Sequence, residues 1–107
     1  MPHFLIQVGY SPTATKSLVD NPDSREETVR RTVESAGGKL HQIFFAFGKY
    51  DVILLAEFPT NQAAAAVGLA TSATGALSHY HTTVLMTPQE ALEAMTKAKS
   101  IAYTPPR

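Results

Sequence analysis

The chain has 107 residues, of which 44% are apolar and 17% charged, and its nine basic and nine acidic residues leave no net charge. This length suits one domain with one core, and without a basic excess we expect no nucleic-acid partner. Cysteine is absent, which excludes disulfides, thiolate metal sites and cysteine nucleophiles and is compatible with the cytoplasmic location that we expect. We expect neither a signal peptide nor a membrane span, because no stretch is apolar and long enough.

Apolar periodicity and turn residues divide the chain into eight elements. Alternating apolar residues predict strands, and an apolar repeat of three or four residues predicts helices. In chain order, the pattern predicts a strand at 3–10, a short helix at 13–19, a helix from about 24 to 36, a hairpin of two strands at 40–58, a helix from 60 to about 74, a strand at 77–86 and a helix at 88–99, followed by a tail at 100–107.

Residues that favour caps and turns predict where the helices begin and end. The helix that ends at Gly37-Gly38 begins either at Asn21-Pro22 or at a capping box of Ser24 with Glu27, and its outer face includes Arg25. Thr60 is expected to cap the next helix, whose alanines and Gly68 make it thin enough to approach a sheet closely. Thr87 and Glu90 form a capping box with proline at the first position of the last helix.

The hairpin at residues 40–58 is the most apolar part of the chain. Gly48-Lys49 is expected to form a two-residue turn, because glycine supplies the backbone freedom that such turns need. Side chains alternate between the two faces of a strand, so this turn sets which residues share a face. The expected pairs are Phe47 with Tyr50, Phe45 with Val52, Ile43 with Leu54, and His41 with Ala56.

The order β-α-β-β-α-β, followed by an extra helix, predicts a ferredoxin-like α+β fold in a single domain spanning residues 1–99. Right-handed crossovers give a four-stranded antiparallel sheet in the order 4-1-3-2, with both long helices on one face. The opposite face is open yet also apolar, and an exposed patch of this kind is unusual in a monomer. We therefore predict a homodimer in which a second copy covers Leu5, Phe44, Ala46, Ile53 and Leu55.

Four parts of the sequence resemble the GYD-domain family of small bacterial and archaeal proteins. They are Gly48-Lys49-Tyr50-Asp51, the preceding Gly37-Gly38-Lys39, the segment VILLAEFP with the Ala-rich helix after it, and the ending TTVLMTPQEA. The likeness covers residues 3–95. It implies membership of the dimeric α+β barrel group, in which two ferredoxin-like domains stack their sheets. His79 and His81 depart from the usual family pattern, so any role they have is particular to this protein or a close subgroup.

The resemblance does not choose a function. The family has no established activity, and proteins of related architecture include cofactor-free monooxygenases, lactone isomerases, haem-dependent enzymes and small-ligand sensing domains. We expect a homodimeric module that binds a small metabolite between the open sheet face and the partner. The alternatives are a cofactor-free oxygenase or isomerase with a histidine base, and a structural oligomer without a ligand.

The predicted strand order brings Gln7, Asp51, His79 and His81 to one end of the open face, next to Tyr50. A carboxylate beside an imidazole fixes its tautomer and raises its pKa, which suits a general base. His79 or His81 is then the candidate base, and Asp51 or Gln7 polarises the substrate. Each residue also has a purely structural interpretation: Asp51 bonded to turn backbone, Tyr50 paired across the strands, and the histidines solvated or at the subunit contact.

Metal and cofactor sites are not expected. His79 and His81 share a strand face and could both reach a metal, but Asp51 is their only obvious third ligand and no thiolate is available. Haem ligation by any of the four histidines is also disfavoured. His3 and His41 lie near strand ends and are expected to be structural or solvated.

Overall fold

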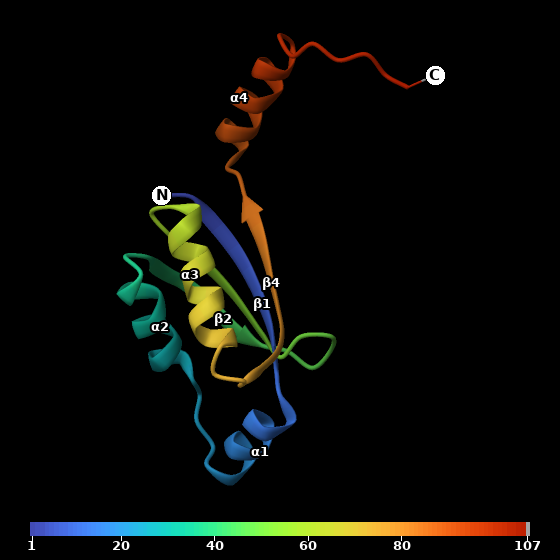
Figure 1. Cartoon of the computed structure of the whole chain (residues 1–107). Helices are drawn as coiled ribbons and strands as arrows, with labels where there is room; N and C mark the ends of the chain where they lie inside the picture. Colours follow the sequence, from blue (N-terminus) through green and yellow to red (C-terminus); the bar gives the residue numbers. More distant parts are fainter. Residues whose placement is uncertain (107) are drawn as a thin grey trace.

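The computed structural model describes residues 1–106. It is an α+β fold in which helices cover one face of a four-stranded sheet (Figure 1). The elements are β1 (His3–Tyr10), α1 (Pro12–Asp20), α2 (Glu26–Ser35), β2 (Lys39–Phe45), β3 (Val52–Glu57), α3 (Asn61–Ser72), β4 (Leu77–Leu85) and α4 (Pro88–Ala98).

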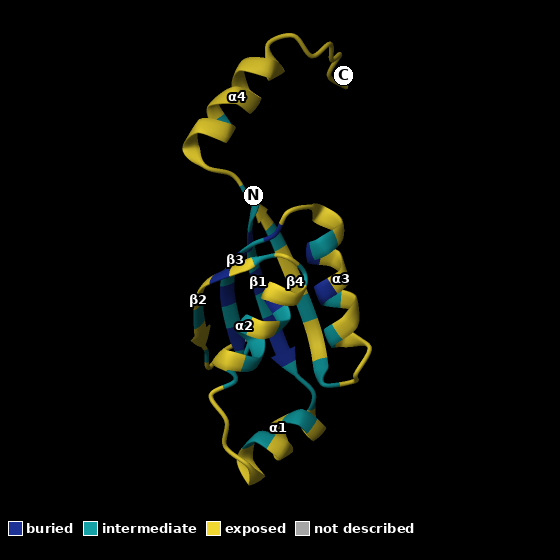
Figure 2. Cartoon of the chain, turned by 90° about the vertical axis from the view of Figure 1, so that its left-hand side faces the viewer, coloured by how far each residue is buried: buried dark blue, intermediate teal, exposed yellow. Residues whose placement is uncertain are grey.

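The sheet is antiparallel and its strands lie in the order β2-β3-β1-β4. This confirms the predicted order, read from the other edge. Figure 2 shows α2 and α3 together on one face, over strands that contain many of the buried residues. The core lies between these layers and consists of Phe4, Ile6, Val8, Val33, Leu40, Val52, Leu54, Ala56, Phe58, Ala64 and Val67.

Two helix starts agree with the sequence and one does not. Thr60 caps α3, and Thr87 with Glu90 forms the expected capping box of α4. Neither predicted start of α2 occurs. The residue before α2 is Arg25, whose backbone is left-handed (φ 65°, ψ −9°) and whose side chain makes no capping hydrogen bond. Asp23 instead holds this corner, because its Oδ1 accepts from the Arg25 backbone N–H at 2.8 Å.

The predicted two-residue hairpin turn is wrong. β2 ends at Phe45 and β3 begins at Val52, and the Ala46 N–H donates to the Asp51 carbonyl at 2.8 Å across the base of a longer loop. Gly48 does not take the positive φ that the predicted turn type needs. The Phe47–Tyr50 pair is therefore absent, and Phe47 is fully exposed at the loop tip.

The strand register is right in the middle of the hairpin and changes near its open end. Phe45 pairs with Val52 and Ile43 with Leu54, as predicted. The register then shifts at His41, so that Leu40 rather than His41 lies opposite Ala56. One extra residue in a strand is a β-bulge, which re-aims the side chain at that position. The predicted His41–Ala56 pair is replaced, and His41 turns to the open face.

The last helix, α4, stands away from the sheet (Figure 1). None of its residues is buried, and Leu92 and Met95 are 55% and 66% exposed. The predicted tail is residues 100–107. Of these, residues 101–106 have no regular structure, and Arg107 lies outside the described residues. Every helix in residues 1–106 is too short or too polar to cross a membrane.

Candidate functional site

The residues predicted to form a site lie at one end of the open face. Gln7 pairs with His81 and Gly9 pairs with His79 across β1 and β4. The Tyr50 ring reaches over from the β2–β3 loop, with its centroid 5.0 Å from that of His79 and 6.4 Å from that of His81. The structure therefore brings Gln7, Tyr50, His79 and His81 into one neighbourhood.

His79 is held by hydrogen bonds on both ring nitrogens. Its Nε2 donates to the Lys49 carbonyl at 2.9 Å, and its Nδ1 shares a hydrogen bond of 2.9 Å with the Ser78 hydroxyl. The ring lies against Gly9, where an added Cβ would stand 2.3 Å from a ring carbon. Because a carbonyl can only accept, Nε2 must carry a hydrogen, and the bond to Lys49 joins β4 to the β2–β3 loop.

The Asp51 carboxylate is used by the backbone. Its Oδ2 accepts from the Tyr10 N–H at 2.8 Å, at the end of β1, and the Asp51 N–H donates to the Val8 carbonyl at 2.8 Å. Within residues 1–106, no hydrogen bond joins Asp51 to His79 or His81. The carboxylate thus has a structural role, but the backbone that it holds is the end of β1 and not the turn backbone that was expected.

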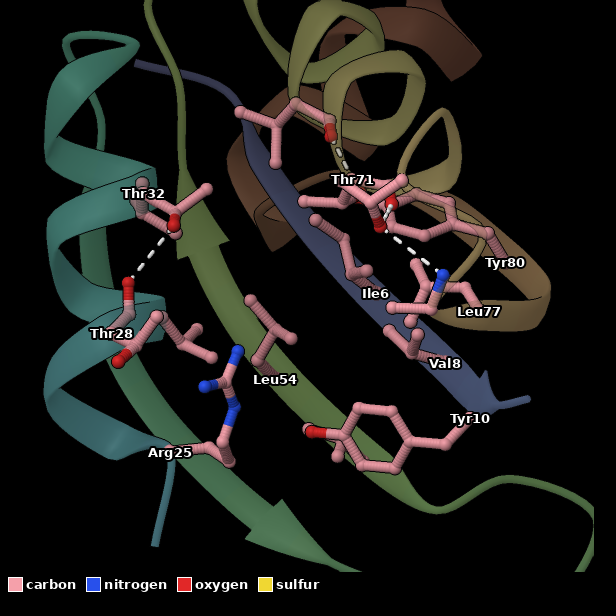
Figure 3. A pocket seen from close by; sticks show the side chains of 16 residues that line it. Ile6, Val8, Tyr10, Arg25, Thr28, Thr32, Leu54, Thr71, Leu77 and Tyr80 are labelled. Carbon is pink, nitrogen blue, oxygen red and sulfur yellow. Dashed lines mark hydrogen bonds between the residues drawn. The ribbon is translucent and has the colours of Figure 1, made fainter. Parts of the chain in front are cut away.

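A pocket of about 190 Å³ lies on the other face of the sheet, between the strands and helices α2 and α3. The walls are mainly aliphatic side chains of the strands and helices, and the rest are hydroxyls, one arginine and two tyrosines (Figure 3). Binding pockets usually combine apolar walls with a few polar groups in this way. The residues that line the pocket include Ile6, Tyr10, Arg25, Leu54, Val67 and Tyr80.

An arginine and a tyrosine hydroxyl lie at one end of this pocket. Figure 3 shows the Tyr10 hydroxyl, at the end of β1, directed toward Arg25, the residue that precedes α2. Burial raises the pKa of Tyr10, and the charge of Arg25 opposes that rise. Three of the four threonine hydroxyls that line the pocket donate to backbone carbonyls: Thr32 to Thr28 at 2.9 Å, Thr71 to Val67 at 2.7 Å and Thr74 to Thr71 at 2.7 Å. Arg25 and Tyr10 can both bind a polar ligand atom at this end, where Arg25 also pairs with Asp23 at 3.4 Å.

Tyr80 forms the wall beneath α3. An added Cβ on Gly68 would lie 3.0 Å from the Tyr80 ring. Because Gly68 has no side chain, α3 packs directly against this ring, as the predicted close approach of a thin helix requires. The Tyr80 hydroxyl is buried without a hydrogen-bond partner among residues 1–106, and burial raises its pKa to about 12. The phenol consequently stays neutral and contributes a ring face to the pocket.

Sequence reasoning missed this pocket because Arg25 was expected on the outer face of α2. The left-handed backbone at Arg25 places its side chain at the end of the pocket instead. A usable signal was the repeat of Thr28 and Thr32, which puts two small polar residues on one helix face next to Val29.

The fold resembles that of a solved structure of low sequence identity. The structure is similar to the crystal structure of hypothetical protein PHS023 from Pyrococcus horikoshii, with a TM-score of 0.51 and 12% identity over 81% of this chain and 92% of that chain. Another similar structure, titled FFRP-DM1, has a TM-score of 0.49 and 13% identity over 80% of this chain and 100% of that chain. No curated protein matches the sequence. The family model described as the GYD domain matches residues 4–95, and the chain therefore belongs to the GYD domain family.

Proposed function

We propose that this protein is a homodimeric domain that binds a small carboxylate with an apolar body in the pocket beneath α2 and α3. The observation that carries the proposal is the pocket itself, in which apolar walls lead to one arginine and one tyrosine hydroxyl. An arginine presents several N–H donors in a plane that matches the two oxygens of a carboxylate. The adjacent apolar walls select a ligand whose remaining atoms are hydrocarbon.

The pocket volume limits the ligand to a small molecule. A cavity of about 150 Å³ accommodates a benzene ring, so the 190 Å³ here suits one ring or a short alkyl chain with a carboxylate attached. A nucleotide or a haem is too large for this space. Short aliphatic acids and phenyl-substituted acids are therefore the appropriate probes.

The proposed dimer forms through the open face of the sheet. Phe44 is 61% exposed there, beside the partly buried Leu5, Ile53 and Leu55. Covering such a patch removes apolar area from water, which stabilises association by roughly 25 cal/mol per Å² before the costs of ordering. The exposed Leu92 and Met95 of α4 add apolar surface that this chain does not cover by itself. Both surfaces support an assembly of at least two copies.

The predicted neighbourhood of Gln7, Tyr50, His79 and His81 would lie at the seam of this dimer. A second ligand position at that seam remains part of the proposal, but catalysis by His79 is poorly supported. A general base needs a ring nitrogen free to take a proton, whereas both nitrogens of His79 are hydrogen-bonded within the chain. This geometry disfavours an oxygenase or isomerase that uses His79 as its base, but within residues 1–106 it does not hold the ring of His81, the other candidate base, in the same way.

Two measurements test the proposed function. Hexanoate and phenylacetate should raise the melting temperature of the protein more than their primary amides do, because only the acids carry the charge that Arg25 recognises. Equal shifts for acids and amides, or no shift with either, would contradict carboxylate binding.

Light scattering should give twice the 11.6 kDa mass of the chain, and Phe44→Asp should give the monomer. A monomeric wild type at micromolar concentration would remove the dimer.

A further inference from the structure

A second group of polar side chains lies at the opposite end of the open face from His79. It consists of His3 on β1, His41 on β2 and Glu57 on β3. β3 lies between β2 and β1 in the sheet, so the carboxylate stands between the two imidazoles. One ligand atom from each residue lies within 4.8 Å of the other two. This group takes no part in the pocket beneath the helices.

The backbone directs all three side chains to the same place. His3 is the direct cross-strand partner of Glu57, and partners opposite each other in a sheet share a face. His41 joins them only because of the β-bulge at its position, which turns it away from the helix side. Bulges of this kind commonly re-aim a side chain for a binding site.

Both imidazoles present the same ring nitrogen to the carboxylate. His41 Nε2 lies 2.5 Å from Glu57 Oε2, and His3 Nε2 lies 3.9 Å from Glu57 Oε1. The two rings are nearly parallel, with an interplanar angle of 13° and centroids 5.7 Å apart. Two nitrogens and a carboxylate thus converge on one point while the side chains stay partly open to solvent.

We propose that His3, His41 and Glu57 bind a divalent transition-metal ion, with zinc as the expected ion and water in the remaining position. Two histidines and a glutamate are an established ligand set for zinc with an open coordination site. Bonds of about 2.0–2.1 Å in a tetrahedron place ligand atoms about 3.4 Å apart. His41 and Glu57 must then separate by about 1 Å and His3 must move closer than its present 3.9 Å from Glu57, which side-chain rotation supplies.

The competing explanation is that His41 and Glu57 only form a surface ion pair. Such a pair needs no contribution from His3 and has no preference among metal ions. A metal site instead requires all three residues and binds one ion per chain. The two explanations therefore differ in stoichiometry and in the effect of changing His3.

The test uses the untagged full chain, purified with chelator and titrated with zinc chloride by calorimetry and with cobalt(II) chloride by visible absorption. The expected result is one zinc per chain at micromolar affinity and the intense absorption of four-coordinate cobalt. His3→Gln, His41→Gln and Glu57→Gln should each weaken zinc binding at least about tenfold. His81→Gln is the matched control, since His81 lies on the same face at the other end, and it should bind zinc as the wild type does.

The zinc titrations and the melting temperature both test the metal site. Zinc should also raise the melting temperature of the wild type, because an ion that binds only the folded chain stabilises it by mass action. Absence of zinc binding at 100-fold excess would overturn the proposal, as would zinc binding that survives in His3→Gln or is lost in His81→Gln. If a variant fails to fold, as judged by circular dichroism without metal, the other two decide. Failure here leaves the carboxylate pocket unaffected, because the two sites share no residue.

Discussion

Arg25 combines an unfavourable backbone conformation with a side chain that points into the pocket, and a pair of substitutions separates these two properties. A residue other than glycine in the left-handed region costs about 1–2 kcal/mol, and Arg25 has φ 65°. Glycine avoids this cost but gives up about 0.5–1 kcal/mol through its more flexible unfolded chain. Arg25→Gly should therefore be more stable than Arg25→Ala by about 1 kcal/mol.

Both variants lose the guanidinium, so the difference between them reports the backbone alone. They also lose the exposed Arg25–Asp23 ion pair equally, and such pairs contribute little. Urea denaturation gives the free energy of unfolding, and the melting shift with hexanoate gives the binding. Neither variant should distinguish hexanoate from hexanamide. An alanine variant as stable as the glycine variant would refute the strain argument, and a retained preference for hexanoate would refute the role of Arg25.

Three further predictions concern Tyr80 and Gly9. Tyr80→Phe removes a buried hydroxyl that has no partner, so it should raise the free energy of unfolding by about 1 kcal/mol in urea denaturation, and a loss of stability would contradict this. Because burial raises the pKa of Tyr80 from 10.0 to about 12, the folded chain keeps a proton that the unfolded chain loses between these values. Stability should then fall as pH rises from 10 to 12, and less steeply in Tyr80→Phe. Gly9→Ala should displace the His79 ring, because the new Cβ would lie 2.3 Å from it; an unchanged imidazole N–H signal in NMR spectra would contradict that.

The order and faces of the strands could be predicted because they follow from alternation and chain order. Phe44, Ile53 and Leu55 lie on the open face as expected, and Val52, Leu54 and Ala56 lie on the helix side. Helix starts at Thr60 and Thr87 could be predicted because the capping side chain bonds to the backbone three residues away. These features depend on local chemistry that the sequence displays.

The features that escaped prediction depend on backbone conformations without a sequence signal. Arg25 is left-handed although glycine or asparagine usually takes that region. The bulge at His41 inserts one residue without any glycine or proline to mark it, and its effect is to exchange the face on which His41 lies. The pocket needs the relative placement of β1, α2 and α3, which no single segment determines. Coordinates were therefore needed to find the pocket and the group of His3, His41 and Glu57, whereas the fold and the neighbourhood of Gln7, His79 and His81 could be predicted.

The most direct test of the proposed function is a methyl NMR titration of the full chain with hexanoate. Binding beneath the helices should shift the methyl signals of Ile6, Val29 and Val67, which line the pocket. The methyl signals of Leu5 and Leu55, on the open face, should stay in place. Shifts confined to Leu5 and Leu55, or no shifts at all, would contradict the proposal that the pocket beneath α2 and α3 binds the ligand.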